Sequence, residues 1–170
     1  MSPQVQIQTE RFILRDLGPS DVTERYLEWL GEPEAQKNIT ATTASLSALM
    51  QYVVERTGRT DVMFLGIFDA LNGVHIGNIK YEPVNSALGY AIVGVLIGDV
   101  AYRGRGVATE VLRASTAWLK ANRQIHQFLL GLWRTNHAAV RAYEKCGFVM
   151  AESPLHPNRP HEAPVMILNL

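Results

Sequence analysis

The residues from 93 to 110 read Val93-Gly94-Val95-Leu96-Ile97-Gly98-Asp99-Val100-Ala101-Tyr102-Arg103-Gly104-Arg105-Gly106-Val107-Ala108-Thr109-Glu110. This pattern is typical of a strand that leads through a basic glycine turn into a helix. Gly104 and Gly106 carry no side chains, so backbone amides there can lie close to a ligand, and the first N–H groups of a helix are unpaired at its positive dipole end. The turn is therefore predicted to bind an anion. Because Arg103 and Arg105 add guanidinium groups that bind phosphate in a bidentate way, a diphosphate fits better than a lone carboxylate.

Two common phosphate-binding loops do not fit this turn. A Walker A loop requires Gly-Lys-Ser/Thr, which the turn lacks. A dinucleotide-binding loop requires a small residue where Thr109 stands and an acidic residue about 20 positions later, but residues 127–130 read Gln-Phe-Leu-Leu. The remaining pattern is Arg103-x-x-Gly106-x-Ala108, for which an ordinary glycine turn before a helix is the alternative interpretation. A second, independent pattern is needed to decide between them.

The size and composition of the chain limit the classes of protein to which it can belong. The chain has 170 residues, of which 47% are hydrophobic, and this predicts a single domain over residues 1–170. Lys and Arg number 16, as do Asp and Glu, so no excess of positive charge favours nucleic acid. The single cysteine, Cys146, cannot form an intramolecular disulfide, the N-terminus lacks the features of a signal peptide, and no apolar run approaches the roughly 20 residues that span a bilayer. We therefore expect a cytoplasmic protein that binds neither nucleic acid nor membrane.

The first third of the chain alternates strand and helix signals. Residues 6–14 predict one strand, Gly18-Pro19-Ser20-Asp21 predicts the start of a helix that ends at Gly31, and a second helix is expected from about Ser45. These two helices suit a lid over the substrate and equally well a simple cover of the sheet, and both interpretations stay open.

The rest of the chain indicates a mixed sheet. The Asn72-Gly73 pair predicts a hairpin between strands 62–68 and 74–81, and residues 88–97 predict the next strand, in which Gly94 and Gly98 indicate a bulge rather than merely a weak strand. The order strand, helix, strand, helix, strand that follows implies local parallel pairing. The segments concerned are a helix at 106–122, a strand at 127–133, a helix at 136–146 capped by Gly147, and strands at 148–151 and 165–168.

The second pattern is Asn136-His137-Ala138-Ala139-Val140-Arg141-Ala142-Tyr143-Glu144-Lys145-Cys146-Gly147-Phe148. Asn136 and Tyr143 are seven residues apart, which is close to two helical turns, so their side chains project from the same face and can contact one ligand. Taken alone, Asn136 is more simply a helix N-cap and Tyr143 a core aromatic residue. Together with the glycine turn upstream, in the same order along the chain, coincidence is the poorer explanation.

These two patterns resemble the Gln/Arg-x-x-Gly-x-Gly/Ala and Asn-x-x-Ala/Ser-x-x-x-Tyr-Glu-x-x-Gly-Phe motifs of the GNAT superfamily of acyl-coenzyme A-dependent N-acyltransferases, over residues 88–148. The opening Arg11-Phe12-Ile13-Leu14-Arg15, with Ser20-Asp21, resembles the ribosomal-protein-alanine N-acetyltransferase (RimJ/RimL-like) branch, whose relatives acetylate protein N-termini, amino sugars and other small amines. The resemblance implies an α/β GNAT fold, with a mixed central sheet of about six to seven strands splayed at the cofactor site and about four flanking helices.

The resemblance also implies a site for acetyl-coenzyme A without a metal. The pyrophosphate lies on the backbone amides of Arg103, Gly104, Arg105, Gly106, Val107 and Ala108, and Thr109 adds a hydroxyl. Backbone groups of Leu96, Ile97 and Gly98 pair with the pantetheine arm as an added strand does. Asn136 holds the cofactor. The acceptor amine attacks the thioester directly, and Tyr143 donates a proton to the departing thiolate.

The base that deprotonates the acceptor amine is not evident. Where the ribosomal alanine acetyltransferases have a glutamate, five residues before the signature asparagine, this chain has Gly131. Glu34, His75, Glu82 and Asp99 are candidates by chemistry alone, and each is more simply a solvated or structural residue.

Several other residues are better explained without a role in catalysis. Cys146 is expected to serve packing rather than nucleophilic attack. His156 and His161 are expected in a proline-rich loop that touches the acceptor rather than as metal ligands. Trp29, Trp118 and Trp133 are most simply core residues.

The sequence thus predicts acetyl transfer from acetyl-coenzyme A to a primary amine, with a protein N-terminal amine slightly ahead of a small amine such as an amino sugar. Two alternatives remain. One is a non-catalytic coenzyme A-binding sensor, which Gly131 favours, and the other is an acyltransferase for longer acyl groups, which depends on the space beside Leu96 and Tyr143. Association into a homodimer through a sheet edge or through the first two helices is a further open prediction.

Overall fold

The computed structural model describes residues 4–32, 45–132, 136–152, 155 and 165–170. Its strands are β1 (Gln6–Gln8), β2 (Phe12–Asp16), β3 (Met63–Asp69), β4 (His75–Asn85), β5 (Tyr90–Ile97), β6 (Gln127–Gly131), β7 (Val149–Ala151) and β8 (Val165–Asn169). Its helices are α1 (Glu24–Gly31), α3 (Leu46–Thr57), α4 (Val107–Arg123) and α5 (His137–Lys145), with short 3-10 turns η1 (Pro19–Asp21) and η2 (Val100–Tyr102).

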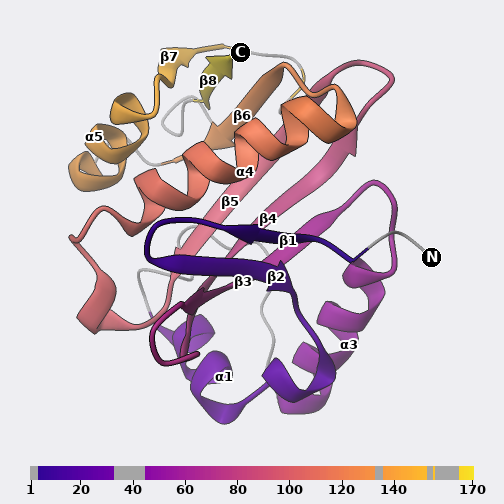
Figure 1. The fold of residues 1–170 in the computed structure, drawn as a ribbon, viewed down its shortest axis with the longest axis vertical. Helices are drawn as coiled ribbons and strands as arrows, with labels where there is room; N and C mark the ends of the chain where they lie inside the picture. The colour runs from indigo at the N-terminus through magenta and orange to yellow at the C-terminus, as the bar shows by residue number, and fades with distance from the viewer. Residues whose placement is uncertain (1–3, 33–44, 133–135, 153–154, 156–164) are drawn as a thin grey trace.

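One mixed sheet organises the molecule (Figure 1). Its eight strands lie in the order β1-β2-β3-β4-β5-β6-β8-β7, and every neighbouring pair is antiparallel except β5 with β6. The predicted α/β architecture with a mixed sheet is confirmed, and the part of the chain that the structure describes holds the four helices expected around it. The strand number exceeds the predicted six to seven by one.

The prediction of a single strand over residues 6–14 is wrong, because the chain turns back at Thr9. The Thr9 backbone N–H donates to the Phe12 carbonyl (2.8 Å), and the Phe12 N–H donates to Thr9 Oγ1 (2.9 Å). These bonds close a hairpin in which Ile7 pairs with Leu14. The residues on both sides alternate, so the hydrophobic pattern alone does not reveal the reversal.

The start of the first helix also differs from the prediction. Pro19–Asp21 forms only the short turn η1, and α1 begins at Glu24, after Thr23, whose side chain accepts a hydrogen bond from the Tyr26 N–H. The second helix is confirmed, since Ser45 caps α3 by accepting from the Ala48 N–H (3.1 Å). Both caps are of the kind that hydroxyl side chains provide at helix N-termini.

The expectation of local parallel pairing holds only for β5 with β6. The strand after α5, β7, pairs with β8 and not with β6, and β8 lies antiparallel between them. Because β8 enters from the last residues of the chain, it takes the edge of β6 that a parallel β7 would have occupied. The strand, helix, strand order does not reveal this insertion.

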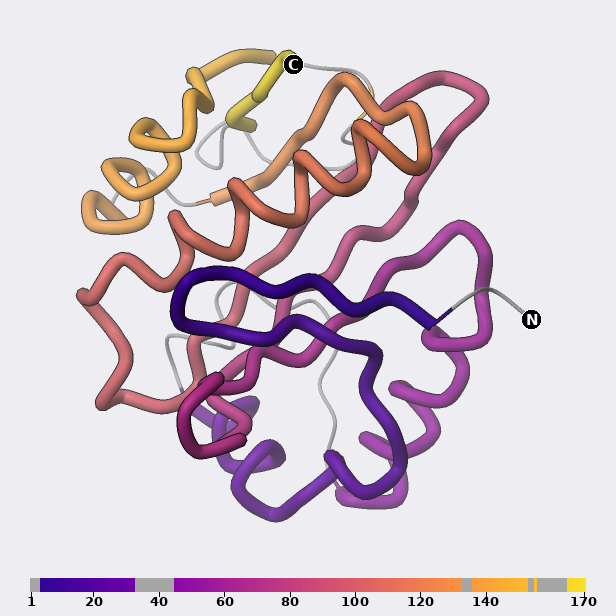
Figure 2. The backbone as a smooth tube through the Cα atoms, in the orientation of Figure 1, coloured from indigo at the N-terminus to yellow at the C-terminus, as the bar shows by residue number. Residues whose placement is uncertain are grey.

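Among the described residues, the core has two large clusters on opposite faces of the sheet and a third, small cluster of Leu129, Val165 and Ile167. Along β5, Val95 and Ile97 pack with the cluster under α4, whereas Leu96 packs with the cluster that includes Tyr26 and Trp29 of α1 and Leu49 and Val53 of α3. Neighbouring residues of a strand point to opposite faces, so α4 covers one face, and α1 with α3 the other (Figure 2). The first two helices therefore do cover the sheet, and Tyr26, Leu30 and Tyr52 from them also line the cavity described below. None of the helices in the described part is long and apolar enough to cross a membrane.

Candidate active site

The central strands separate where the candidate site lies. β5 pairs with β6 only from Tyr90 to Ile92, opposite residues 127–129, whereas Leu130 and Gly131 of β6 pair with β8 instead. Beyond Ile92, the edge of β5 that faced β6 thus has no strand partner within the described ranges. The predicted splay of the sheet at this position is confirmed.

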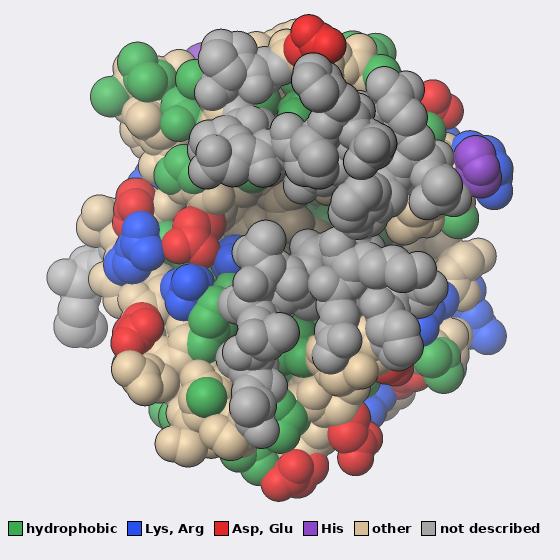
Figure 3. Space-filling model, turned by 180° about the vertical axis from the view of Figure 1, so that it is seen from behind, with side chains coloured by type: hydrophobic (Ala, Val, Ile, Leu, Met, Phe, Trp, Pro, Cys, Tyr) green, Lys and Arg blue, Asp and Glu red, His purple; other side chains and the backbone are tan. Residues whose placement is uncertain are grey.

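A cavity of about 920 Å³ occupies the space beside the separated strands. It follows β5 from Tyr90 to Ile97 and continues along the turn that leads into α4, and Gly131, Asn136 and Tyr143 also line it. Seen from behind, the surface is hollowed across the middle, with basic and acidic side chains next to each other at the left of the hollow (Figure 3). This volume is in the range of pockets that enclose most of a small-molecule ligand.

The glycine turn borders this cavity with its backbone. Gly104 and Gly106 have φ angles of +71° and +73°, a left-handed conformation that favours glycine. Gly106 occupies the N-cap position of α4, so the N–H groups of the first turn of α4 follow directly. Among the residues predicted to hold the pyrophosphate, Arg103, Gly104, Gly106, Val107 and Ala108 line the cavity, and so does Thr109. Arg105 is exposed and is not part of the lining.

The side chain of Arg103 has a structural partner at the end of β5. Its guanidinium group donates to the carbonyls of Ile97 (2.9 Å) and Gly98 (3.0 Å), and it pairs with Glu32 (2.8 Å). In this arrangement Arg103 ties the turn to β5, and the backbone, rather than this guanidinium, is what the turn offers to an anion.

Hydrogen bonds from the first hairpin, which the sequence did not reveal, also fix the glycine turn and the start of α4. Arg11, in the turn between β1 and β2, donates through Nε to Glu110 Oε2 (2.7 Å) and through Nη2 to the Arg105 carbonyl (3.0 Å). Thr9 donates its hydroxyl to Glu110 Oε1 (2.7 Å). Although partial burial alone would raise the pKa of Glu110, the hydrogen bonds from Thr9 and Arg11 outweigh it and lower that pKa. The first hairpin therefore holds the start of α4, beside which it lies in Figure 2.

The end of β5 has a backbone available for a ligand. The Gly98 N–H donates to the Ile76 carbonyl of β4 (3.0 Å), and backbone groups alternate in direction along a strand. Ile97 and Val95 consequently direct their backbone groups toward the side that β6 has left. The Ile97 carbonyl already accepts from Arg103 (2.9 Å), so Ile97 offers its N–H. Leu96 and Ile97, two of the three residues predicted to pair with pantetheine, line the cavity, and Gly98 does not. Val95 also lines the cavity, and the alternation of backbone groups makes it a further residue that can pair with the ligand.

The predicted bulge is wrong at Gly94. At Gly98, just after β5, the N–H groups of Gly98 and Asp99 both donate to the Ile76 carbonyl (3.0 Å each), which is the two-against-one arrangement of a bulge. The β4–β5 ladder is regular from Gly77 opposite Ile97 to Tyr81 opposite Val93, and the irregularity lies between Tyr81 and Val84 on β4. Each glycine has a different role. A Cβ atom at Gly98 would overlap the ring of Trp29, whereas a Cβ atom at Gly94 would meet nothing within 4 Å and would project into open space.

Asn136 and Tyr143 both border the cavity from α5. Asn136 is the N-cap of α5, since its Oδ1 accepts from the Ala139 N–H (3.2 Å). This bond uses the carbonyl end of the carboxamide and leaves its NH₂ group for a ligand. Burial raises the pKa of Tyr143 to about 12, so its phenol keeps its proton at neutral pH.

Cys146 contributes to the contact between α4 and α5. Its thiol donates to the Thr109 carbonyl (3.6 Å), and the Thr109 hydroxyl donates to the Ala142 carbonyl (3.4 Å). Burial raises the pKa of the Cys146 thiol, which therefore stays protonated and unreactive. The expected packing role agrees with these contacts.

Two of the four base candidates are structural residues outside the cavity lining. His75 Nε2 bonds to the Gly77 carbonyl (2.9 Å) and to Asn78 Oδ1 (2.8 Å), and burial lowers its pKa. Asp99 accepts from the Ala101 N–H (2.9 Å) and pairs with Arg25.

Trp29 is buried and Trp118 packs on the core, as expected. The predictions for Glu34, Trp133, His156 and His161 fall outside the described residues.

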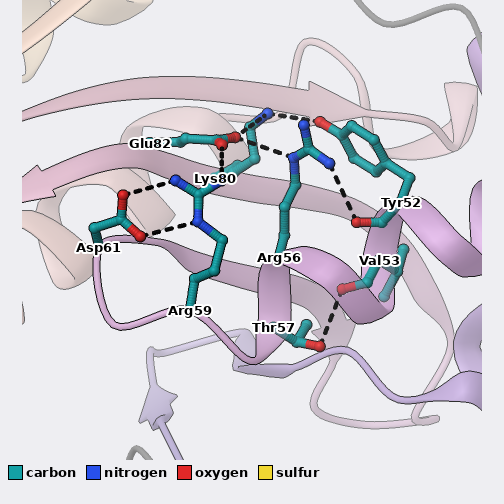
Figure 4. Close-up of polar contacts among 8 residues, drawn as sticks. All are labelled: Tyr52, Val53, Arg56, Thr57, Arg59, Asp61, Lys80 and Glu82. Atoms are coloured by element: carbon teal, nitrogen blue, oxygen red, sulfur yellow. Dashed lines mark hydrogen bonds and ion pairs between the residues drawn. The ribbon is translucent and has the colours of Figure 1, made fainter.

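The remaining candidate, Glu82, does line the cavity but is surrounded by cations (Figure 4). Its Oε2 accepts from Arg56 (3.1 Å) and Lys80 (3.0 Å), and its Oε1 accepts from Arg59 (3.0 Å). Partial burial alone would raise the pKa of this carboxyl, but Lys80 and Arg56 outweigh burial and lower it. A carboxylate held in this way is a weak proton acceptor.

One cavity thus brings together the separated strands β5 and β6, the glycine turn at the N-terminus of α4 and the protonated Tyr143. The chain matches the model of the acetyltransferase (GNAT) domain over residues 11–149 and belongs to this family of acetyltransferases. No curated protein sequence matches it.

Solved structures with the same fold have distant sequences. A GNAT-family acetyltransferase from Bacillus anthracis superposes with a TM-score of 0.80 at 16% identity, covering 97% of this chain and 98% of that one. RimL, a ribosomal L7/L12 α-N-protein acetyltransferase in complex with coenzyme A, has a TM-score of 0.82 at 14% identity, covering 98% of both chains. A dodecameric spermidine N-acetyltransferase from Vibrio cholerae has a TM-score of 0.74 at 18% identity, covering 94% of both chains.

Proposed function

We propose that this protein transfers an acetyl group from acetyl-coenzyme A to a primary amine by direct attack of the amine on the thioester. The observation that carries the proposal is that one cavity brings together the free edge of β5, the left-handed glycine turn at the start of α4, and Tyr143. Membership of the acetyltransferase family supports the same reaction. The cofactor supplies the acetyl group in activated form, as a thioester.

The residues present fit this cofactor. The amides of residues 104–108 would bind its diphosphate, because the N-terminal amides of α4 lie at the cavity without an intrahelical partner. The Arg103 N–H already donates to the Val100 carbonyl (3.3 Å). Val95 and the Ile97 N–H would bind the pantetheine arm through the β5 backbone, whereas the backbone groups of Leu96, between them, face β4. Thr109 and Asn136 would contact the cofactor through their side chains. RimL, which has the same fold, is described in complex with coenzyme A.

Tyr143 would act as the general acid. Its raised pKa keeps the phenol protonated, so it can donate to the sulfur as the carbon–sulfur bond breaks. A free α-amino group has a pKa of about 8 and a lysine side chain about 10.4, so the amine must lose a proton before it attacks. Since Glu82 is a weak acceptor, we assign this proton to water in the cavity rather than to a protein base.

For the acceptor, a protein N-terminal amine stands slightly ahead of a small amine such as an amino sugar. RimL, by its name, acts on a protein N-terminus, and the Vibrio cholerae enzyme acts on spermidine, so the fold accommodates both kinds of amine. Resemblance of residues 11–15 to the RimJ/RimL-like branch favours the first. We also propose that the protein is cytoplasmic and that it forms a homodimer. Sedimentation analysis would measure the mass of the assembly and so test the homodimer.

The test begins with calorimetric titration of acetyl-coenzyme A, followed by a thiol-release assay on N-terminal peptides, amino sugars and polyamines. Binding with turnover supports the proposal and identifies the class of acceptor. Binding without turnover on any amine would favour the coenzyme A sensor, to which Gly131 at the cavity wall points. Faster turnover with butyryl- than with acetyl-coenzyme A would favour the acyltransferase for longer chains. No binding would refute the cofactor site itself.

A further inference from the structure

One wall of the cavity carries a group of polar side chains that the cofactor site does not use. Asn78, Lys80 and Glu82 come from β4, and Tyr52 comes from α3, and all four line the cavity. Asn78 and Lys80 are two residues apart on one strand, so they face the same side and lie about 6.6 Å apart along it. Lys80 lies opposite Gly94, on the part of β5 from which β6 has separated.

The carboxylate in this group is already paired with three cations. Glu82 accepts three hydrogen bonds from three different cationic side chains, Arg56, Arg59 and Lys80, as Figure 4 shows. Arg59 also holds Asp61 by two bonds of 2.9 Å and 2.7 Å. An incoming ammonium group would therefore approach Glu82 against the positive charge of these three side chains.

The donors, in contrast, have hydrogen atoms to spare. The Lys80 ammonium has three N–H bonds, of which one donates to Tyr52 Oη (2.6 Å) and one to Glu82 Oε2 (3.0 Å). Because the Tyr52 oxygen accepts from Lys80, its own O–H is directed elsewhere. Counting contacts among the described residues, Lys80 and Tyr52 thus each retain one donor.

Asn78 is an independent sign of a missing acceptor. Its Oδ1 is held by His75 Nε2 (2.8 Å), which fixes the carboxamide so that Nδ2 is the donor end. This residue is 4% exposed, and Nδ2 has no hydrogen-bond partner in the described part of the chain. Leaving a buried donor without a partner destabilises the protein, and a ligand with acceptor oxygens would remove that penalty.

We propose that the amine acceptor also carries an anionic group, a carboxylate or a phosphate, which Lys80 and Tyr52 bind while Asn78 donates to a neighbouring oxygen of the acceptor. The inference rests on the proposed function and specifies its substrate. The group of charged residues in Figure 4 consists of three cations, Arg56, Arg59 and Lys80, and two carboxylates, Glu82 and Asp61, so it favours an anion and repels a polyamine. A positive charge close to the bound amine also lowers the pKa of that amine and helps it to lose its proton.

The test uses pairs of amines that differ in one anionic group, at saturating acetyl-coenzyme A and fixed pH. In the first pair, glucosamine 6-phosphate is compared with glucosamine. In the second, a tripeptide with two aspartates after its N-terminal serine is compared with a tripeptide that has two lysines in those positions. Spermidine serves as the polycationic amine. We expect kcat/KM at least tenfold higher for the anionic member of a pair. If the ratio of kcat/KM values is larger for the sugar pair, the anionic group is that of a sugar phosphate. If it is larger for the peptide pair, the anionic group is that of an acidic peptide.

Variants then assign the preference to a residue. Lys80→Gln should reduce the preference for the anionic amine at least fivefold, Lys80→Arg should retain most of it, and Tyr52→Phe should lower it less than Lys80→Gln. Lys120→Gln is the matched control, because Lys120 is exposed in the last turn of α4 and is not part of the cavity lining. Melting temperatures of all variants exclude an effect on folding.

Two results would overturn the inference while the proposed function stands: spermidine or the neutral amine turned over faster than its anionic partner, or a preference that survives Lys80→Gln. A protein that binds acetyl-coenzyme A but acetylates no amine would refute the proposed function instead. In that case, calorimetry of glucosamine 6-phosphate against the coenzyme A-bound protein still decides the anion site. Binding that Lys80→Gln abolishes supports the site, and no binding refutes it.

Discussion

Tyr143 faces the cavity from α5, and its burial raises the pKa of the phenol to about 12. If Tyr143 is the proton donor, Tyr143→Phe removes the acidic proton while it keeps the ring that packs near Phe148. We expect kcat to fall roughly 100-fold or more, in line with general acid catalysis, with little change in the dissociation constant for acetyl-coenzyme A. Stopped assays and calorimetry measure the two quantities. Unchanged turnover would remove Tyr143 from the acid role.

The same raised pKa predicts the shape of the pH profile. The acceptor amine must be neutral, so kcat/KM should rise with pH as the amine loses its proton. A general acid must be protonated, and a pKa raised to about 12 keeps Tyr143 protonated up to that pH. We therefore expect no falling limb from this residue below about pH 11, as long as the protein stays folded. A falling limb near pH 9 that disappears in Tyr143→Phe would contradict the raised pKa.

Gly106 allows a test of the anion cradle with a matched control. Gly106→Glu places a negative side chain beside the N-terminal amides of α4, at a φ of +73°. Gly73, in the exposed β3–β4 turn, has the same φ of +73° and is not part of the cavity lining. Both substitutions carry the same backbone strain, about 1–2 kcal/mol. We expect calorimetry to detect no acetyl-coenzyme A binding by Gly106→Glu and normal binding by Gly73→Glu.

What the sequence predicted at this scale depended on local motifs. The glycine turn and the Asn136 to Tyr143 pattern each lie within one turn or one helix, so residue spacing alone predicts which backbone or side chains share a face. Residue spacing could not predict that the structure brings together Tyr52, Lys80 and Arg59. These residues come from α3, β4 and the loop between α3 and β3. Likewise, nothing local indicates that the Arg103 guanidinium bonds to Ile97 and Gly98.

At the scale of elements, the close contact between α1 and the end of β5 can be tested through Gly98. A Cβ atom there would overlap the ring of Trp29, which is 5% exposed in the cluster under α1 and α3. We expect Gly98→Ala to lower the free energy of unfolding by about 1–3 kcal/mol, the usual cost of overpacking. Gly94→Ala, on the same strand but with open space around its Cβ, is the control for stability. Urea denaturation measures both, and equal stabilities would contradict the tight contact.

The elements themselves were predictable where their signals are local. Ser45 and the Asn72-Gly73 pair lie at the helix start and the hairpin where they were expected. Strand order was less accessible, because it depends on contacts between distant parts of the chain. The insertion of β8 between β6 and β7 joins residues 127–131 to residues 165–169, and no spacing rule within either segment specifies that pairing.

At the scale of the whole molecule, all eight strands from β1 to β7 belong to one sheet, and the cavity lies beside the point where β5 and β6 separate. A ligand bound there contacts α4, α5 and β5 together, so its binding energy should stabilise the whole fold rather than one part. Acetyl-coenzyme A at 100 times its dissociation constant should add about 2.7 kcal/mol of stability, which for a domain of this size raises Tm by about 5–11 °C.

Calorimetric melting with and without acetyl-coenzyme A checks this prediction together with the prediction of a single domain. For one domain, we expect a single transition whose calorimetric and van't Hoff enthalpies agree, shifted as a unit by the ligand. Gly106→Glu should melt in one transition that acetyl-coenzyme A does not shift, whereas Gly73→Glu should respond like the unmodified protein. Two transitions, of which the ligand moves only one, would show that the sheet does not unfold as one unit. The separation at β5 and β6 would then be a boundary between cooperative units, because those two strands pair only over residues 90–92 and 127–129.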